Sequence, residues 1–200
     1  MSGPAPGGTD RRALRESLRE RRQALPAAAR IQAAEAIARH LLDSDVLAPG
    51  YIAGYWAQGG ELPLHVLQLR LRGEHAWCLP CLEPGGRLRF APWRPGDDLV
   101  ANAYGIPEPA LAPSSRLDPT DLAVVLVPLV AFSPTGVRLG MGGGYYDRSF
   151  AFRLDAAAPP RLIGVGYDFQ RVDGLQAEPW DVPLDAVVTE SGLHPCRPAG

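Results

Sequence analysis

Lysine is absent from this 200-residue sequence, and all twenty basic residues are arginine. Any cationic role in binding or catalysis must therefore belong to arginine, whose planar guanidinium can hold a phosphate through two parallel hydrogen bonds. The acidic residues number 22, so the formal net charge is only −2. At the level of the whole chain, nothing calls for nucleic acid or a membrane surface as a partner.

Cysteine and long apolar runs are scarce as well. The three cysteines, Cys78, Cys81 and Cys196, cannot all pair with one another, and so few do not indicate a fold built on disulfides. This favours a reducing compartment, and we expect a cytoplasmic protein. The longest apolar run, 122–132, is interrupted by Pro128 and is shorter than the roughly 18 residues of a membrane span.

The length and the composition fit one compact domain. Hydrophobic residues make up 46% of the chain and charged residues 21%, which is close to the globular average. We expect residues 1–9 to form a disordered lead-in, residues 10–194 to form the domain, and residues 195–200 to form a flexible tail. The sequence shows no internal repeat and no second domain boundary.

Helix-like and strand-like segments alternate along the chain. Periodicity and turn residues predict helices over 10–25, 27–42, 63–72 and 145–154, and strands over 51–57, 75–79, 87–93, 122–129, 161–167 and 185–189. The continuous apolar run 122–129 is typical of a strand buried on both faces of a parallel sheet. The alternation predicts an α/β fold with three α/β/α layers around an open, mostly parallel sheet.

A glycine-rich turn follows the most apolar of these strands. Its five glycines fall within nine residues, and they are Gly136, Gly140, Gly142, Gly143 and Gly144. Ligands of open α/β sheets bind beyond the carboxyl ends of strands. Glycine lets the backbone approach a ligand closely, and the N–H groups near a helix start suit an anion. Arg138 can add a phosphate contact, and Asp147 can bind Mg²⁺.

The turn fits neither of two common phosphate-binding patterns. It has no Gly-Lys-Ser/Thr sequence of a P-loop, and its glycine spacing is not that of a dinucleotide fingerprint. On glycines alone, a merely flexible turn explains the pattern equally well. The aromatic and acidic residues that follow at once, Tyr145, Tyr146 and Asp147, favour a binding site over a simple turn.

The residues around the turn carry a family resemblance. The runs Val127-Pro-Leu-Val-Ala-Phe132, Gly136-Val-Arg-Leu-Gly140 and Gly142-Gly-Gly-Tyr-Tyr-Asp-Arg148 resemble the signature of the 5-formyltetrahydrofolate cyclo-ligase family, also called methenyltetrahydrofolate synthetases. Weaker matches follow in order along most of the chain: the arginine-rich first helix, Gly60-Glu61, Gly105-Ile-Pro-Glu-Pro109, Ile163-Gly-Val-Gly-Tyr167, Gln170, Asp181-Val-Pro-Leu-Asp185 and Thr189-Glu190.

The resemblance implies an enzyme that uses Mg²⁺ and ATP to convert 5-formyltetrahydrofolate into 5,10-methenyltetrahydrofolate. In that reaction ATP phosphorylates the formyl oxygen, the second folate nitrogen attacks the formyl carbon, and ADP and phosphate leave. Such a site mainly needs alignment and charge neutralisation. The expected partners are therefore ATP and a reduced folate, with no nucleic acid and no membrane, and we expect a monomer.

The resemblance also implies roles for particular residues. It assigns ATP binding to Arg11, Arg15, Arg138, Gly140, Gly142, Gly143, Gly144 and Tyr145. It assigns folate binding to Glu61, Tyr104 and Tyr146, catalysis to Arg138 and Tyr146, and Mg²⁺ to Asp147 and Asp185. For Asp185, a structural role as the cap of a helix or turn is an equally open interpretation. Arg11 and Arg15 lie four residues apart, which places both on one face of the predicted helix.

Four positions depart from the residues usual in the family. Ser133 replaces a common Asp, Met141 replaces Tyr or Arg, Trp180 replaces His, and Pro63 replaces an Asp after Glu61-Leu62. These departures leave open a non-catalytic member that binds nucleotide or folate and acts as a regulator. A third hypothesis is RNA binding through the arginine-rich segment 11–22, which the balancing acidic residues disfavour.

Overall fold

The computed structural model describes residues 10–197, so the predicted lead-in over 1–9 lies outside the described residues, as do residues 198–200. The helices are α1 (Arg11–Gln23), α2 (Ala27–Leu42), α3 (His65–Arg70) and α4 (Tyr145–Ser149). The strands are β1 (Gly50–Ala53), β2 (His75–Glu83), β3 (Arg87–Pro92), β4 (Leu99–Ala101), β5 (Pro107–Pro109), β6 (Val124–Pro128), β7 (Ala131–Phe132), β8 (Arg138–Leu139), β9 (Arg161–Val165), β10 (Ala186–Thr189) and β11 (Gly192–Pro195). Short 3₁₀ turns are η1 (Pro113–Ser115), η2 (Pro119–Asp121), η3 (Ala151–Leu154) and η4 (Asp168–Gln170).

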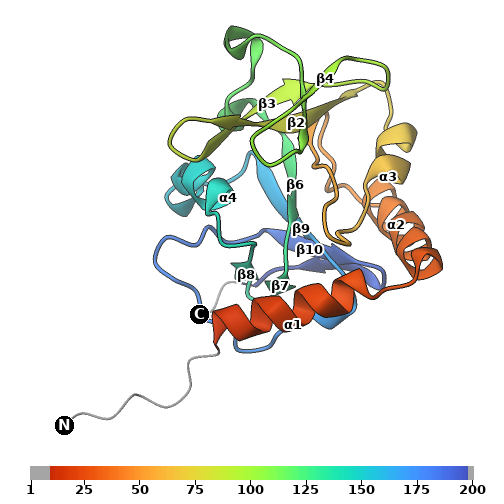
Figure 1. Cartoon of the computed structure of the whole chain (residues 1–200), viewed down its shortest axis with the longest axis vertical. Helices are drawn as coiled ribbons and strands as arrows, with labels where there is room; N and C mark the ends of the chain where they lie inside the picture. The colour runs from red at the N-terminus through yellow and green to blue at the C-terminus, as the bar shows by residue number, and fades with distance from the viewer. Residues whose placement is uncertain (1–9, 198–200) are drawn as a thin grey trace.

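A central sheet has the strand order β11-β10-β9-β6-β1-β2-β3, and Figure 1 labels β10, β9, β6, β2 and β3 among these strands. The inner neighbours run parallel, and the edge strands β3 and β11 run antiparallel to their neighbours. The predicted open, mostly parallel sheet is confirmed. From β1 the chain continues to β2 and β3 on one side, and from β6 it continues to β9 and β10 on the other. The topological switch point, where such sheets bind ligands, therefore lies between β1 and β6.

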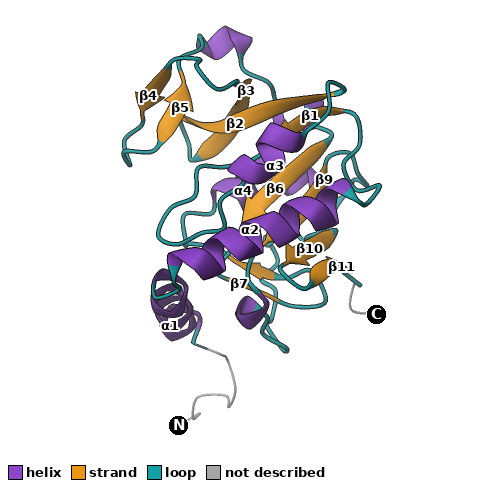
Figure 2. Ribbon diagram, turned by 90° about the vertical axis from the view of Figure 1, so that its right-hand side faces the viewer, coloured by secondary structure: helices purple, strands orange, loops and turns teal. Residues whose placement is uncertain are grey.

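Helices cover both faces of the sheet. α2 and α3 lie over one face (Figure 2), where Ile37 and Leu41 share an apolar cluster with Ile52 of β1. α4 and η3 lie over the other face, where Phe150 shares a second cluster with Val125 of β6. Because both faces are covered, β6 is buried along nearly its whole length, as its continuous apolar sequence predicts.

Helix α1 lies across the end of the sheet at which β6 finishes (Figure 1). Asp10 begins it by accepting hydrogen bonds from the backbone N–H groups of Arg12 and Ala13, as an N-cap does. Its buried Leu18 packs in a small cluster with Val130 and Leu139, which flank the loop after β6. The first helix is therefore attached to the segment that carries the glycine-rich turn.

The structure differs from the sequence prediction in the segment 95–119. The sequence predicts no helix or strand there, but residues 99–109 form the β4–β5 hairpin. The carboxamide oxygen of Asn102 accepts hydrogen bonds from the backbone N–H groups of Tyr104 and Ile106 and so closes the hairpin turn. Its strands are short and β5 contains two prolines, so no alternation of polar and apolar residues marks them in the sequence.

The structure also differs from the prediction at the end of α4 and near the end of the chain. α4 ends at Ser149, and only the 3₁₀ turn η3 continues the predicted helix over 145–154. β11 ends at Pro195, and the backbone N–H groups of Cys196 and Arg197 donate to the carbonyls of Asp185 and Pro134. Within residues 10–197, no helix is long and apolar enough to cross a membrane.

Candidate active site

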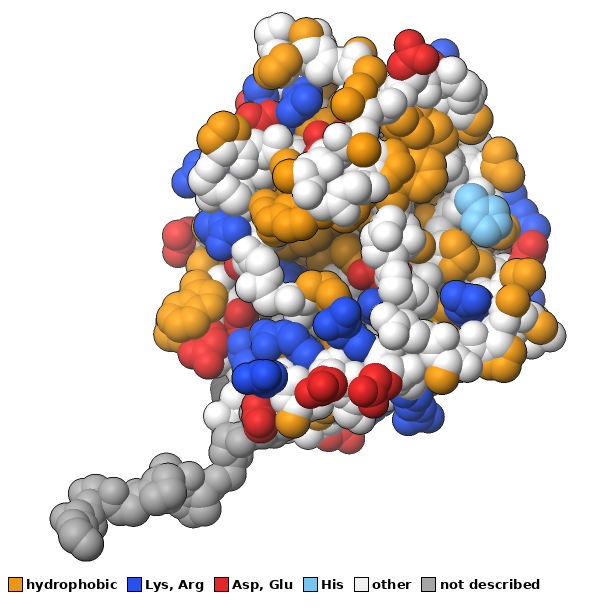
Figure 3. All heavy atoms as spheres, viewed as in Figure 1, with side chains coloured by type: hydrophobic (Ala, Val, Ile, Leu, Met, Phe, Trp, Pro, Cys, Tyr) orange, Lys and Arg blue, Asp and Glu red, His pale blue; other side chains and the backbone are white. Residues whose placement is uncertain are grey.

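A cavity of about 880 Å³ opens beyond the carboxyl ends of β1 and β6, at the switch point of the sheet. The space-filling view shows it as a hollow with an apolar interior (Figure 3). Its walls come from α1, the loop after β1, the β2–β3 and β4–β5 hairpins, the glycine-rich loop and α4. This volume lies near the upper end of the range for small-molecule sites and suits two bound substrates.

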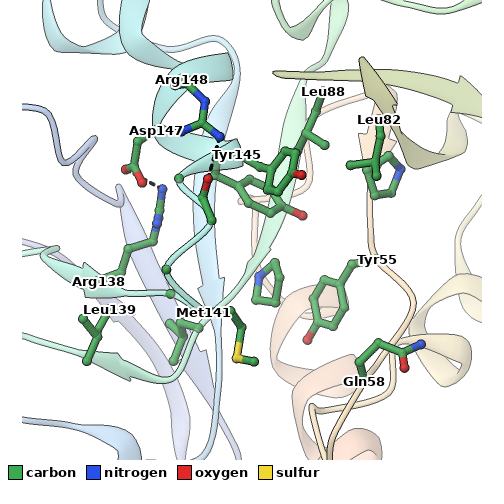
Figure 4. A pocket seen from close by; sticks show the side chains of 18 of the residues that line it. Tyr55, Gln58, Leu82, Leu88, Arg138, Leu139, Met141, Tyr145, Asp147 and Arg148 are labelled. Carbon is green, nitrogen blue, oxygen red and sulfur yellow. Dashed lines mark hydrogen bonds and ion pairs between the residues drawn. The ribbon is translucent and has the colours of Figure 1, made fainter. Parts of the chain in front are cut away.

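The glycine-rich loop forms one wall of the cavity (Figure 4). Gly142 and Gly144 adopt φ angles of 98° and 66°, which residues with a side chain rarely tolerate. A Cβ atom at Gly142 would meet no other atom within 4 Å, so the backbone there borders open space. The loop can therefore bring backbone N–H groups close to an anion, as the sequence predicts.

Arg138 and Asp147 form an ion pair at this wall. Nη2 of Arg138 lies 2.7 Å from Oδ1 of Asp147, which also accepts a hydrogen bond of 3.1 Å from the backbone N–H of Val182. Arg138 is almost fully buried, and its guanidinium lies 5.8 Å from the centre of the Tyr146 ring. These contacts hold the side chains of Arg138 and Asp147 beside the loop (Figure 4).

Two arginines of α1 line the same cavity. Nη2 of Arg11 lies 2.8 Å from Oδ2 of Asp181, and Nε of Arg15 donates to the carbonyl of Gly140 at 2.9 Å. The residues are four apart in the helix, so both side chains leave α1 on one face. The structure thus brings Arg11 and Arg15 together with the glycine-rich loop, more than 120 residues later in the chain.

Glu61 lies on the opposite side of the cavity, in the loop after β1. Its carboxylate is mostly buried, accepts a hydrogen bond of 3.0 Å from the backbone N–H of Gln58, and lies 3.8 Å from Nη1 of Arg22. Burial raises the pKa of Glu61, and the Gln58 N–H group and the Arg22 charge oppose that rise. The same burial raises the pKa of Tyr146 well above its ordinary value, so Tyr146 keeps its proton at neutral pH.

Tyr104 reaches the cavity from the β4–β5 hairpin. Its hydroxyl lies 2.7 Å from the hydroxyl of Tyr145, and the two rings meet edge to face at 6.2 Å. Tyr104 is largely exposed, so its ring lies at the rim rather than inside. The hairpin that the sequence prediction missed therefore carries one of the residues that the family resemblance named.

Asp185, which the family resemblance places near the metal, does not line this cavity. Its carboxylate accepts hydrogen bonds from Arg153 at 2.9 and 3.1 Å and from the backbone N–H of Leu162 at 2.7 Å, so it fixes the start of β9. Asp181, four residues earlier, lines the cavity beside Arg11. Both aspartates lie in the run Asp181-Val-Pro-Leu-Asp185 that carries part of the family resemblance. Their spacing alone could not tell which of them faces the cavity.

Two of the four unusual positions lie at the cavity and two do not. Met141 and Trp180 are exposed at its rim. Ser133 is buried in the β7–β8 turn, where its hydroxyl accepts from the backbone N–H of Val137 and lies 2.7 Å from that of Thr135. Pro63 does not line the cavity. The exchanges at Ser133 and Pro63 therefore leave the cavity wall intact.

Comparison with known proteins gives one consistent result. The profile of the 5-formyltetrahydrofolate cyclo-ligase family matches residues 8–190. The chain is 37% identical over 179 residues to a 5-formyltetrahydrofolate cyclo-ligase of Escherichia coli K12, covering 87% of this chain and 97% of that protein. It is 34% identical to the Haemophilus influenzae protein of the same name, covering 87% and 94%. Its fold matches the Aquifex aeolicus 5,10-methenyltetrahydrofolate synthetase with a TM-score of 0.79 and 29% identity, over 96% of this chain and 95% of that one.

Proposed function

This chain belongs to the 5-formyltetrahydrofolate cyclo-ligase family, and from that premise we propose that it converts 5-formyltetrahydrofolate into 5,10-methenyltetrahydrofolate, with ATP as the phosphoryl donor. The observation that carries the proposal is the single cavity that joins two unlike walls. One wall offers arginines and a glycine-rich loop to phosphates, and the other offers a buried carboxylate to a ring with N–H groups. A site for two substrates of these two chemistries needs both walls.

The nucleotide side is supported by the orientation of three arginines. Arg11, Arg15 and Arg138 each donate to an acceptor at the cavity wall, which fixes their guanidinium groups near the loop. Phosphate oxygens are stronger acceptors than backbone carbonyls, and guanidinium binds them with two bonds. We assign the triphosphate to these arginines and to Gly140, Gly142, Gly143 and Gly144, with Tyr145 beside them.

The residues present fit a magnesium ion held by Asp147 and Asp181. Both carboxylates border the cavity, and the backbone N–H of Val182, the residue after Asp181, donates to Asp147. Within residues 10–197, no three His, Cys, Asp or Glu side chains form a metal cage. Mg²⁺ suits this poor donor set, because it usually takes one or two carboxylates, phosphate oxygens and waters. When bound, it would neutralise phosphate charge.

The reaction needs two substitutions. In the first, the formyl oxygen attacks the γ-phosphorus, the bond from that phosphorus to ADP breaks, and a phosphorylated imidate forms on the folate. In the second, the neighbouring folate nitrogen attacks the formyl carbon, the carbon–oxygen bond to phosphate breaks, and the nitrogen loses its proton. Both substitutions are favoured by alignment of the reacting atoms and by neutralisation of the transferred phosphoryl group.

Particular side chains serve these two substitutions. We assign neutralisation of the transferred phosphoryl group to Arg138. Because burial keeps Tyr146 protonated, this residue acts as a hydrogen-bond donor near the reacting oxygen and not as a base. Glu61 accepts N–H groups of the pterin, and Tyr104 covers the ring from the hairpin. In this division of roles, one wall neutralises the transferred phosphoryl group and the other recognises the folate.

The test of the proposal is an absorbance assay for the methenyl chromophore. Purified protein with ATP, Mg²⁺ and 5-formyltetrahydrofolate should form the product, and a non-hydrolysable ATP analogue should give none. If no methenyl absorbance develops even at high enzyme concentration, the proposed function is wrong. Calorimetric binding of ATP and folate without turnover would instead favour the regulatory alternative, which the exposed Met141 and Trp180 at the cavity rim motivate.

Replacing Asp181 or Asp185 by asparagine gives a separate prediction about the metal. Asp181→Asn should raise the Mg²⁺ concentration for half-maximal turnover by about tenfold or more, because one of two carboxylate ligands is lost. Asp185→Asn should leave that concentration within about twofold and lower stability by about 1 kcal/mol, because it weakens the acceptor of Arg153 and Leu162. Magnesium titrations and thermal melts of both variants measure this, and the reverse pattern would return Asp185 to the metal site.

A further inference from the structure

The loop that carries Glu61 is held by three side-chain donors, one from α1, one from the segment after β9 and one from the start of the loop itself. These donors bind three of its backbone carbonyls: Nε of Arg22 to Gly59 at 3.1 Å, Oη of Tyr167 to Gly60 at 3.3 Å, and Oη of Tyr55 to Leu62 at 2.9 Å. Tyr55 and Tyr167 are buried, and Arg22 is only 2% exposed. These three hydrogen bonds hold the backbone on both sides of Glu61. They therefore fix the conformation of the loop and the direction in which the Glu61 side chain leaves it.

Arg22 is the most unusual of the three anchors. It lies in the last turn of α1, and its Nη1 donates to the carbonyl of Leu129 at 3.2 Å, just after β6. The same Nη1 lies 3.8 Å from Oε1 of Glu61. One buried guanidinium therefore links α1, the end of β6 and the loop after β1, which are the three elements that meet at the switch point.

A buried guanidinium costs free energy unless its charge and its donors find partners. The carbonyls of Gly59 and Leu129 satisfy donors of Arg22, and the Glu61 carboxylate balances its charge. Arg22 itself does not line the cavity, whereas Glu61 and Leu129 do. Any effect of Arg22 on a ligand must therefore pass through the groups that it holds.

The surroundings of Glu61 show what the charge of Arg22 does. Burial raises the pKa of Glu61, while the Gln58 N–H group and Arg22 lower it. The other titratable groups that face the carboxylate are Tyr55 and Tyr146, and burial raises the pKa of both, so they stay neutral. Arg22 thus supplies the positive charge that keeps this buried carboxylate ionised and able to accept two N–H groups.

We propose that Arg22 is a positioning residue for the folate substrate, which holds the Glu61 carboxylate ionised and directed into the cavity without contacting either substrate. This inference rests on the proposed function. It separates Arg22 from Arg11 and Arg15 of the same helix, which face the nucleotide wall. Loss of Arg22 should therefore weaken the use of folate and spare the use of ATP.

The experiment is steady-state kinetics of Arg22→Met with each substrate varied in turn. The KM for 5-formyltetrahydrofolate should rise about 10- to 100-fold, the size expected when a hydrogen bond between a folate N–H group and the charged Glu61 is lost. The KM for ATP should stay within about twofold. The acid limb of kcat/KM for folate should move to higher pH, because Glu61 then protonates more easily. Arg19→Met, an exposed arginine one turn earlier in α1, is the matched control and should change none of these.

Two further variants keep the inference testable if Arg22→Met unfolds. Arg22→Lys retains the charge but cannot reach both carbonyls with a fork, so it should raise the folate KM and leave the acid limb in place. Adding Arg22→Lys to Glu61→Gln should cost far less in folate KM than Arg22→Lys costs alone, since the two act through one group.

The outcomes that overturn the inference are distinct from those that overturn the function. An active wild type whose Arg22 variants show an unchanged folate KM, or an ATP KM that rises equally, overturns the positioning role alone. Additive effects in the double variant also overturn it, because they would show that Arg22 acts on the fold and not on Glu61. A wild type that forms no methenyl product overturns the proposed function and this inference with it.

Discussion

Arg138→Ala is expected to lower kcat by about a thousandfold or more while the protein stays folded, because a cation that neutralises a transferred phosphoryl group contributes on this scale. In the structure the guanidinium lies between Asp147 and the Tyr146 ring at the cavity wall. Its removal leaves Asp147 with the Val182 N–H group and partial access to water, so the fold has other means to satisfy that carboxylate. The methenyl assay measures turnover, and circular dichroism checks the fold.

Two controls separate charge from geometry in this experiment. Arg138→Lys keeps the charge but loses the two-pronged fork, so we expect turnover between those of the wild type and the alanine variant. Arg171→Ala also removes an arginine from an ion pair with an aspartate, but that pair with Asp173 is exposed, and its loss should leave kcat unchanged. An Arg138→Ala variant that is folded and retains more than about a tenth of the wild-type turnover would contradict the role that we assign to Arg138.

The parts of the site that are contiguous in the sequence could be predicted from it. The turn over 136–147 carries its glycines, its arginine and its carboxylate in one short run, so local rules on φ angles and helix starts were enough to mark it. The long apolar strand before it also identified the layer in which it lies. Here the physics that shapes the segment is local, and the structure confirmed the predicted sheet class.

The parts that depend on long-range contacts could not be predicted in this way. Whether Asp181 or Asp185 reaches the cavity depends on which of them meets Arg11 and which meets Arg153, and neither contact leaves a pattern in the sequence. The same holds for Arg22, which the sequence does not distinguish from the other arginines of the segment 11–22. Its burial follows from the loop that packs over it, more than 30 residues later.

The positions that depart from the family pattern have different places in the structure. Ser133 closes a turn through its hydroxyl, a task that asks for a short polar acceptor and not for a charge. Met141 and Trp180 present apolar surface at the cavity mouth, where they would contact the outer parts of a substrate. We therefore expect these two positions to bear on which substrates enter, whereas Arg138 and Asp147, to which we assign the chemistry, are less exposed.

Glu61→Gln is expected to raise the KM for 5-formyltetrahydrofolate by about 100-fold, or ~2.7 kcal/mol, with the KM for ATP unchanged. A carboxylate can accept two N–H groups from the pterin, whereas the glutamine amide would present its own donor to one of them. The exchange also replaces the anionic partner of the buried Arg22 by a neutral amide, so part of the loss is the cost of an unbalanced charge. Kinetics with each substrate varied in turn measure the effect, with Glu35→Gln, a carboxylate of an exposed pair with Arg70, as the control.

The pH profile gives this last prediction a sign that a purely structural role would not produce. Folate binding needs the ionised form of Glu61, and burial raises its pKa. In the wild type, kcat/KM for folate should therefore have its full value above that raised pKa and should fall as the pH drops through it. In Glu61→Gln no carboxylate titrates there, so the acid limb should disappear while the overall value stays low. An acid limb that persists unchanged in the glutamine variant would show that another group controls it and would remove Glu61 from folate recognition.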